Sequence, residues 1–201
     1  MLKSPQVHLI DDDEAMRTSL SFLLDSAGLS NAVYASAEAF LDDIADDTTG
    51  CVITDIRMPG MSGMELVSFL KSKGAQLPVV VITGHGDVPL AVEAMKNGVV
   101  DFLEKPFDDD VLLAAIRRAL VEHRPEAEST GQVTFSSVLA ALSPRETEVL
   151  RGVVAGKANK VIAYELGISP RTVEVYRANV MAKTGAKGLP ELVRMAMSAG
   201  F

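Results

Sequence analysis

Five polar side chains stand where apolar segments of the chain end, and together they could support phosphoryl transfer. They are three carboxylates, a hydroxyl and an ammonium group, from Asp11, Asp12, Asp55, Thr83 and Lys105. Carboxylates brought close together repel one another, and a hard divalent cation such as Mg²⁺ or Mn²⁺ would relieve that repulsion. One carboxylate could then act as a nucleophile and form an aspartyl phosphate. Thr83 could donate a hydrogen bond to a phosphoryl oxygen, and Lys105 could balance its charge.

Each of these residues also has an ordinary structural interpretation. An acidic cluster after a strand is usually a solvated turn or a helix N-cap, and Asp13 and Glu14 are expected to be that. Thr83-Gly84 alone is typical of a turn, and Lys105-Pro106 of a strand exit. The phosphoryl-transfer interpretation depends on the fact that all of these residues lie at the ends of predicted strands.

The segments that must position these groups alternate between strand and helix patterns. Apolar runs predict strands at 7–10, 33–34, 51–54, 79–83 and 99–103, with helices between them and a last helix at 108–122. This alternation predicts an α/β doubly wound, five-stranded parallel sheet of the flavodoxin-like type. Functional groups gather at the carboxyl ends of the strands in such a sheet, so the five side chains should meet at one edge.

Composition indicates a globular protein with two unlike parts. The 201 residues are 48% hydrophobic and 5% aromatic, which excludes disordered and fibrous classes. No apolar run approaches the roughly 20 residues that span a bilayer, and no signal peptide is evident, so a cytoplasmic protein without membrane association is expected. Residues 1–124 carry 10 basic and 20 acidic side chains, giving −10, whereas residues 125–201 carry 9 and 7, giving +2. Contacts with nucleic acid are therefore expected in the C-terminal part.

A linker at 123–137 is predicted to separate a domain at 1–122 from one at 138–201, because this stretch lacks apolar periodicity. In the second domain, Ser143-Pro144-Arg145-Glu146 is a capping box that opens a helix. A short helix to Leu166, a turn at Gly167 and a longer helix at 170–183 follow. That order is typical of a helix-turn-helix.

The helix at 170–183 is the predicted DNA-reading element. Base edges are expected to meet Glu174, Val175, Ala178 and Asn179. Glu174 could accept from cytosine and Asn179 could pair with adenine, although Val175 could instead be core and Glu174 a surface charge. Phosphate contacts, which position the protein without reading sequence, are expected from Lys160, Arg171, Thr172, Arg177, Lys183 and Lys187.

Four motifs in the N-terminal domain resemble the receiver domain of two-component response regulators. They are Ile10-Asp11-Asp12-Asp13, Asp55-Ile56-Arg57-Met58-Pro59-Gly60-Met61, Thr83-Gly84-His85-Gly86 and Lys105-Pro106-Phe107. The resemblance implies that Asp55 is the phosphoacceptor, and that Asp11, Asp12, Asp55 and the Arg57 backbone carbonyl bind Mg²⁺. It also implies a switch in which Thr83 turns toward the phosphoryl group and Phe102 moves inward, and a cis bond between Lys105 and Pro106.

Motifs in the C-terminal domain resemble the LuxR-type DNA-binding domain. They include Leu142-Ser143-Pro144-Arg145-Glu146, Leu166-Gly167-Ile168-Ser169 and Thr172-Val173-Glu174-Val175-Tyr176-Arg177. Ala158 stands where that family commonly has a capping Ser, so Asn159 is expected to cap the short helix instead. Thr184-Gly185 is less apolar than the usual end of the recognition helix.

Both domains together resemble regulators of the FixJ type along nearly the whole chain. The resemblance implies a transcription activator, not an enzyme, that acts on nitrogen-fixation or low-oxygen genes. Its implied partners are a FixL-like haem-bearing histidine kinase, promoter double-stranded DNA, RNA polymerase and a second copy of the chain. Phosphorylation is expected to relieve inhibition by the receiver and to favour a homodimer through the face at 89–103.

Three alternatives remain open at this point. A LuxR-type or FixJ-type regulator could serve another pathway. An aspartyl-phosphate phosphohydrolase of haloacid dehalogenase type would need its nucleophile after the first strand, whereas Asp55 follows the third. A ligand-sensing LuxR-type regulator would carry an apolar signal pocket in its N-terminal half.

Overall fold

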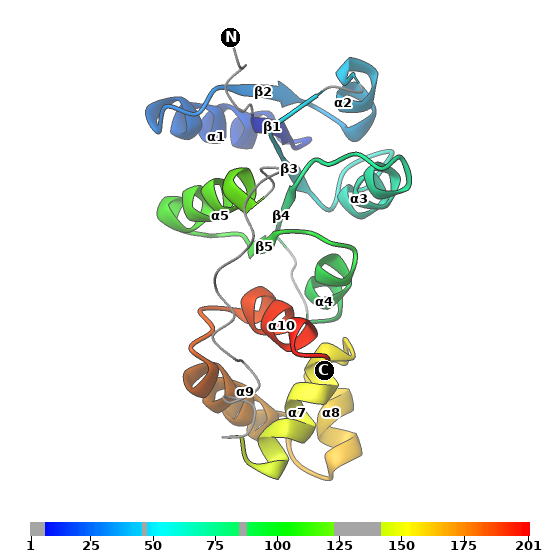
Figure 1. Ribbon diagram of the computed structural model, residues 1–201, viewed down its shortest axis with the longest axis vertical. Helices are drawn as coiled ribbons and strands as arrows, with labels where there is room; N and C mark the ends of the chain where they lie inside the picture. The colour runs from blue at the N-terminus through cyan, green and yellow to red at the C-terminus, as the bar shows by residue number, and fades with distance from the viewer. Residues whose placement is uncertain (1–6, 46–47, 85–87, 123–141) are drawn as a thin grey trace. The chain divides into compact units, whose positions relative to one another are not determined.

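The computed structural model describes residues 7–45, 48–84, 88–122 and 142–201 (Figure 1). These residues divide into two compact units, the first with a β-sheet and helices and the second with helices. None of the helices in the described ranges is both long and apolar enough to cross a membrane. The predicted linker at 123–137 lies outside the described residues.

The first unit contains the predicted five-stranded parallel sheet. Its strands are β1 (Val7–Ile10), β2 (Asn31–Tyr34), β3 (Cys51–Asp55), β4 (Val79–Thr83) and β5 (Asp101–Glu104). Their order is β2-β1-β3-β4-β5. The strands β3 and β4 are buried along their whole length, which explains why apolar residues run through them with little alternation. The last strand starts later than predicted: its pairing with β4 begins at Asp101, and the buried residues Val99 and Val100 precede it.

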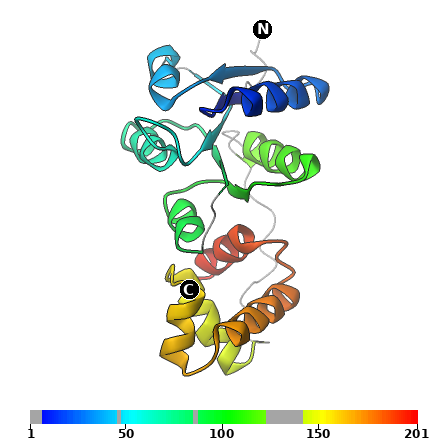
Figure 2. The same ribbon diagram turned by 180° about the vertical axis from the view of Figure 1, so that it is seen from behind.

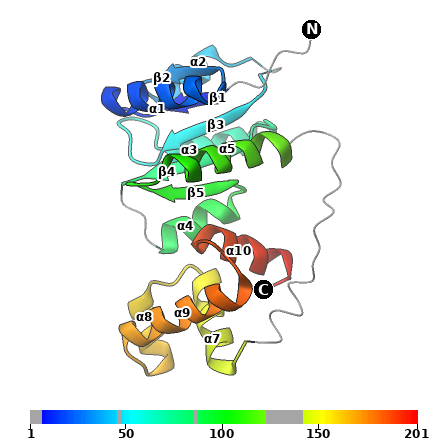
Figure 3. The same ribbon diagram turned by 90° about the vertical axis from the view of Figure 1, so that its left-hand side faces the viewer.

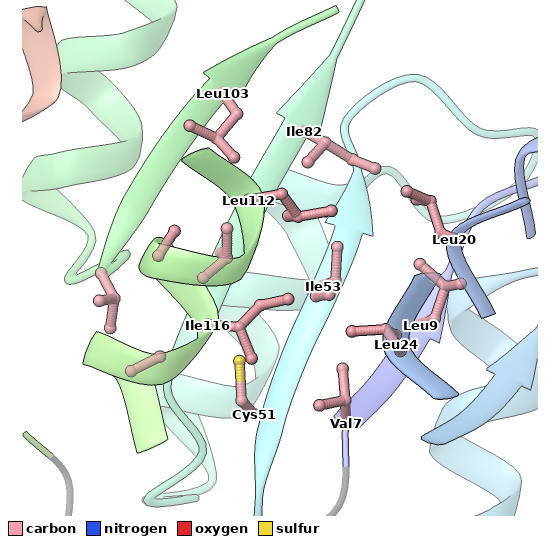
Figure 4. Close-up of a cluster of buried hydrophobic side chains, with 14 residues drawn as sticks. Val7, Leu9, Leu20, Leu24, Cys51, Ile53, Ile82, Leu103, Leu112 and Ile116 are labelled. Carbon is pink, nitrogen blue, oxygen red and sulfur yellow. The ribbon is translucent and has the colours of Figure 1, made fainter. Parts of the chain in front are cut away.

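Helices cover both faces of this sheet. One face carries α1 (Glu14–Ser26) and α5 (Asp109–Glu122), and the other carries α2 (Ala37–Asp43) and α3 (Gly63–Ser72), as Figures 1, 2 and 3 show. Figure 4 shows the core under α1 and α5, where Leu24 and Ile116 pack with Leu9 and Ile53. Cys51 is part of this core, and its burial raises the pKa of the thiol to about 12. It is therefore a free, buried thiol of the core.

The second unit is helical. It comprises α4 (Val88–Lys96), α7 (Pro144–Val154), α8 (Asn159–Leu166), α9 (Pro170–Thr184) and α10 (Leu189–Ser198). The predicted capping box opens α7, with Ser143 and Glu146 satisfying each other's backbone N–H groups. One apolar cluster joins Val92 and Met95 of α4 to side chains of α7, α8, α9 and α10. A second cluster joins α7, α9 and α10.

Candidate functional site

The ammonium group of Lys105 bridges the carboxylates of Asp11 and Asp55. Its Nζ lies 2.8 Å from Oδ2 of Asp11 and 2.7 Å from Oδ2 of Asp55. The strands β1 and β3 are neighbours, so Asp11 and Asp55 meet at the carboxyl edge of the sheet, and Lys105 reaches them from beyond β5. The structure thus brings together three of the groups that the sequence singled out.

Asp11 and Asp12 differ sharply in exposure although they are adjacent. Asp11 is fully buried and Asp12 is exposed. The Oδ1 atom of Asp11 accepts the backbone N–H of Asp13 at 2.9 Å, while Asp13 caps α1 through the N–H groups of Ala15 and Met16. The predicted N-cap role of Asp13 is confirmed, and Asp11 is the carboxylate that turns inward to Lys105.

Asp55 is the last residue of β3 and directly precedes a closed loop, residues 56–62. Its Oδ1 accepts the backbone N–H of Arg57 at 3.1 Å, and its Oδ2 accepts from Lys105. The N–H of Gly63 donates to the carbonyl of Ile56 at 3.0 Å and closes the loop. A Cβ at position 63 would lie 2.2 Å from the Asp55 carbonyl oxygen, so this closure requires glycine.

The electrostatics of the site favour a charged lysine. Burial alone would lower the pKa of Lys105, but hydrogen bonds to Asp11 and Asp55 and their negative charges raise it overall. The ammonium form is therefore favoured at neutral pH beside both carboxylates. Two carboxylates against one ammonium leave a net negative charge where a cation or an electrophilic phosphorus could approach.

The chemistry of the donor set at this edge suits Mg²⁺, which prefers carboxylate, carbonyl and water oxygens. The structure groups Asp11 with Asp55, and exposed Asp12 adjoins Asp11 in the chain. Within the described part of the chain, no three acidic, His or Cys side chains are close enough to hold a metal ion. The predicted metal roles of Asp11, Asp12, Asp55 and the Arg57 carbonyl therefore stay predictions.

The two predicted switch residues are buried in adjacent strands. Thr83 is fully buried at the end of β4, and its carbonyl accepts the backbone N–H of Lys105 at 2.7 Å. Phe102 pairs with Val81 in the β4–β5 ladder and is also buried. The bond between Lys105 and Pro106 is cis, as predicted. His85 and Gly86 of the predicted motif lie outside the described residues.

The helix α9 carries the predicted base-reading residues on its solvent side. Glu174, Val175, Ala178 and Asn179 are all exposed, whereas Val173 and Val180 are buried. Ser169 caps the helix by accepting the N–H of Thr172 at 3.0 Å. Lys160 and Lys187 are exposed as well, so the residues predicted for base edges and several of those predicted for phosphates are open to a ligand.

Three of the charged side chains that were predicted to contact phosphates have partners inside the domain. The ammonium of Lys183 lies 2.7 Å from Oε2 of Glu146. Arg171 pairs with Glu174 at 2.9 Å, one turn along α9. Arg177 donates to Oδ1 of Asn159 at 2.9 Å, and its burial lowers the pKa of the guanidinium against the opposing effect of Glu174.

The expectation that Asn159 caps α8 is wrong. The N-cap is Ala158, whose side chain makes no capping hydrogen bond. Asn159 is the first residue inside the helix, and its amide oxygen is engaged by Arg177 of α9. The side chain therefore joins α8 to α9 instead of ending α8. Local spacing could not indicate this contact, because the two residues are 18 positions apart.

Two acidic residues that were not predicted as site residues contact the predicted ones or the loop beside them. Glu146 is buried and accepts from Lys183 and from the backbone N–H of Ser143. Glu38 of α2 accepts the backbone N–H of Met61, in the loop that follows Asp55, at 2.7 Å. The capping box gave a local signal for Glu146, but nothing in the sequence near Glu38 indicates its partner, 23 positions away.

Two family models match the chain, one for each set of motifs. The response regulator receiver domain matches residues 7–117, and the luxR family of bacterial regulatory proteins matches residues 140–196. The first match contains Asp11, Asp55 and Lys105, and the second contains the helices α7, α8 and α9.

Several relatives match this chain over nearly its whole length. The transcriptional regulatory protein FixJ of Azorhizobium caulinodans is 56% identical, with 100% of this chain and 95% of that protein covered. FixJ of Rhizobium meliloti is 54% identical, with coverage of 97% and 96%. The crystal structure of full-length FixJ from B. japonicum is 53% identical, covers 98% of each chain and has a TM-score of 0.59.

These relatives are transcriptional regulators, which excludes the phosphohydrolase alternative, and the receiver match excludes a ligand-sensing N-terminal half. The predicted sheet and helix-turn-helix are both present. The chain belongs to the FixJ-type two-component response regulators, which join a receiver domain to a LuxR-type DNA-binding domain.

Proposed function

We propose that Asp55 accepts a phosphoryl group from a histidine kinase and that this modification switches on binding of the chain to promoter DNA. The observation that carries the proposal is the Lys105 ammonium bonded to both Asp11 and Asp55. It supplies a fixed positive charge beside the carboxylate that would be modified, which is the main contribution a protein makes to phosphoryl transfer.

In the transfer step, a carboxylate oxygen of Asp55 forms a bond to phosphorus as the bond from phosphorus to the kinase imidazole breaks. The electron pair of that bond leaves with the imidazole nitrogen. Lys105 and the hydroxyl of Thr83 stabilise the phosphoryl oxygens. Asp11, Asp12, Asp55 and the Arg57 carbonyl would hold Mg²⁺, which, when bound, supplies further positive charge to those oxygens.

The packing of α4 supports a role for it in the switch. Val92 and Met95 are buried in the second unit, in one cluster with Val153 of α7 and Val193 of α10. The proposed dimer face at 89–103 includes both α4 residues. Because one surface cannot be covered by two partners at once, dimerisation through it competes with this packing. Phosphorylation would favour the dimer, in which two α9 helices could reach half-sites one turn of DNA apart.

The physiological partners follow from the family and its chemistry. A FixL-like sensor kinase would supply the phosphoryl group, and the exposed residues of α9 would read promoter DNA in the cytoplasm, where RNA polymerase is recruited. Nitrogen-fixation or microaerobic genes are the proposed targets, since the FixJ relatives cover nearly the whole chain at 53–56% identity.

The test is Mg²⁺-dependent labelling of the full chain with acetyl phosphate, followed by intact mass measurement and a DNA-binding assay. The unchanged chain should gain one phosphoryl group and bind promoter DNA more tightly. Asp55→Asn should do neither. Normal activation of that variant would show that the switch is assigned to the wrong residue.

A further inference from the structure

The loop that follows Asp55 is held at its far end by a side chain from another helix. Glu38, in the first turn of α2, accepts the backbone N–H of Met61 through Oε1 at 2.7 Å. The neighbouring residue, Gly60, has a φ of +77°, and a Cβ there would lie 2.5 Å from the same oxygen. Glycine at position 60 thus supplies the turn and leaves room for the carboxylate.

A second carboxylate fixes the next amide of the loop. Glu65 of α3 accepts the backbone N–H of Ser62 at 2.8 Å and the Ser62 hydroxyl at 2.7 Å. Two consecutive amides, those of Met61 and Ser62, are therefore bound by carboxylates from two different helices. Glu65 belongs to the capping box of its own helix, whereas Glu38 reaches across from a separate element.

Glu38 is well suited to remain an ionised acceptor. Hydrogen bonds from its own backbone N–H, from Met61 and from the Ser36 hydroxyl lower the pKa of its carboxyl. Glu38 is exposed, so it adds no apolar packing to the core. Its contact with Met61 connects α2 to the loop 56–62, whose other end bears Asp55 and the Arg57 amide that bonds to it.

The geometry points to Glu38 as a positioning residue for the phosphoacceptor site: by fixing residues 60 and 61 it keeps the Asp55 loop in the conformation that binds Mg²⁺ and accepts the phosphoryl group. This inference rests on the proposed function of Asp55. Groups that hold a metal-binding loop in place change metal affinity without touching the metal, because the loop no longer has to be ordered at the moment of binding.

The experiment measures Mg²⁺ affinity of the full-length chain from amide NMR shifts of residues 55–63 during titration with MgCl₂. The chain has no Trp, which rules out tryptophan fluorescence as the readout. Glu38→Ala should weaken Mg²⁺ binding about three- to tenfold, the range expected from loss of one solvent-exposed hydrogen bond of ordinary strength. Glu38→Asp keeps the charge but is too short to reach Met61, and should weaken binding similarly.

Two variants serve as controls. Glu38→Gln retains a side-chain oxygen that can accept the Met61 N–H and should keep most of the affinity. Asp42→Ala removes the same charge from an exposed position of the same helix, and should change the affinity less than about twofold. Since Ala favours the helix, loss of the fold in Glu38→Ala is not expected.

Unchanged Mg²⁺ affinity in Glu38→Ala would show that Glu38 does not position the phosphoacceptor loop. A loss in Asp42→Ala as large as that in Glu38→Ala would assign the effect to net charge and also overturn the inference. Labelling with acetyl phosphate keeps the two proposals apart. If the unchanged chain is not labelled at Asp55, the proposed function fails, whereas labelling with no effect of Glu38→Ala defeats only the positioning role.

Discussion

The ammonium of Lys183 lies 2.7 Å from the carboxylate of Glu146 and thereby ties the last turn of α9 to the first turn of α7. Glu146 is buried, and it also accepts the backbone N–H of Ser143 at the start of α7. A charge of Lys183 that is already paired inside the domain is less available to a DNA phosphate. The contact therefore predicts that Lys183 orients α9 instead of binding a DNA phosphate.

Replacing Lys183 with Met should weaken DNA binding about three- to tenfold and lower the unfolding temperature, because the buried carboxylate of Glu146 loses its ionic partner. The slope of log affinity against log salt should stay the same, since no phosphate contact is removed. Fluorescence anisotropy with promoter DNA over a range of salt concentrations measures the DNA affinity and the salt slope. A smaller salt slope in Lys183→Met would show that Lys183 contacts a DNA phosphate after all.

Lys160 should behave in the opposite way. It is exposed at the start of α8, so Lys160→Ala should leave the unfolding temperature unchanged. Binding should weaken by a similar factor on all DNA sequences, and the salt slope should fall by about 0.9, the value for one phosphate on duplex DNA. The same anisotropy titrations provide the measurement, and an unchanged slope would contradict a phosphate contact.

Glu146 also predicts a pH dependence of stability. The hydrogen bond from Lys183, followed by that from the Ser143 backbone, lowers the pKa of Glu146 from 4.5 to about 2. A carboxyl whose pKa is lower in the folded state stabilises the fold above its unfolded pKa, and the contribution is lost as the pH falls through its folded pKa. The difference in unfolding temperature between the unchanged chain and Glu146→Gln should therefore be full near pH 6 and shrink between about pH 4.5 and 2. Calorimetry across this range would show it, and a constant difference would argue against the ion pair.

Removing the charge of Lys105 should separate metal binding from phosphoryl transfer. In Lys105→Met, the carboxylates of Asp11 and Asp55 lose their shared ammonium, so Mg²⁺ should bind about three- to tenfold more tightly. Phosphorylation by acetyl phosphate should slow by about 100-fold, because a positive charge next to the transferred group is gone. The shift of the unfolding temperature with MgCl₂ measures the first effect. Weaker Mg²⁺ binding in this variant would be inconsistent with the site described.

Features that depend on local pattern were predictable from the sequence. The buried strands β3 and β4 are apolar runs, and Ser143 and Glu146 form a capping box three residues apart. The meeting of Asp11, Asp55 and Lys105 could also be predicted, because parallel strands put their carboxyl ends at one edge. That prediction depended on the alternation of strands and helices along the chain, which indicates a parallel sheet.

Long-range contacts between two helices, or between a helix and a loop, were not predictable. The pairs Lys183–Glu146 and Glu38–Met61 depend on how helices and loops pack, and neither residue type indicates its partner. The assignment of Asn159 as a cap was wrong for the same reason. A polar residue near a helix start usually caps it, but here a tertiary contact with Arg177 prevails.

The packing of α4 predicts that the unphosphorylated chain is restrained from binding DNA. Met95 is 7% exposed in the cluster that joins α4 to α7 and α10, so Met95→Glu would place a carboxylate among apolar side chains. Burial of an unpaired charge is strongly unfavourable, and the population should shift to a form in which α4 is released. DNA affinity of the unphosphorylated chain should then rise by about tenfold or more. Lys96→Gln, which changes the net charge by the same −1 at the adjacent exposed position, is the matched control and should leave the affinity nearly unchanged. If Met95→Glu binds DNA no better than that control while its thermal unfolding remains cooperative, the packing of α4 does not restrain DNA binding.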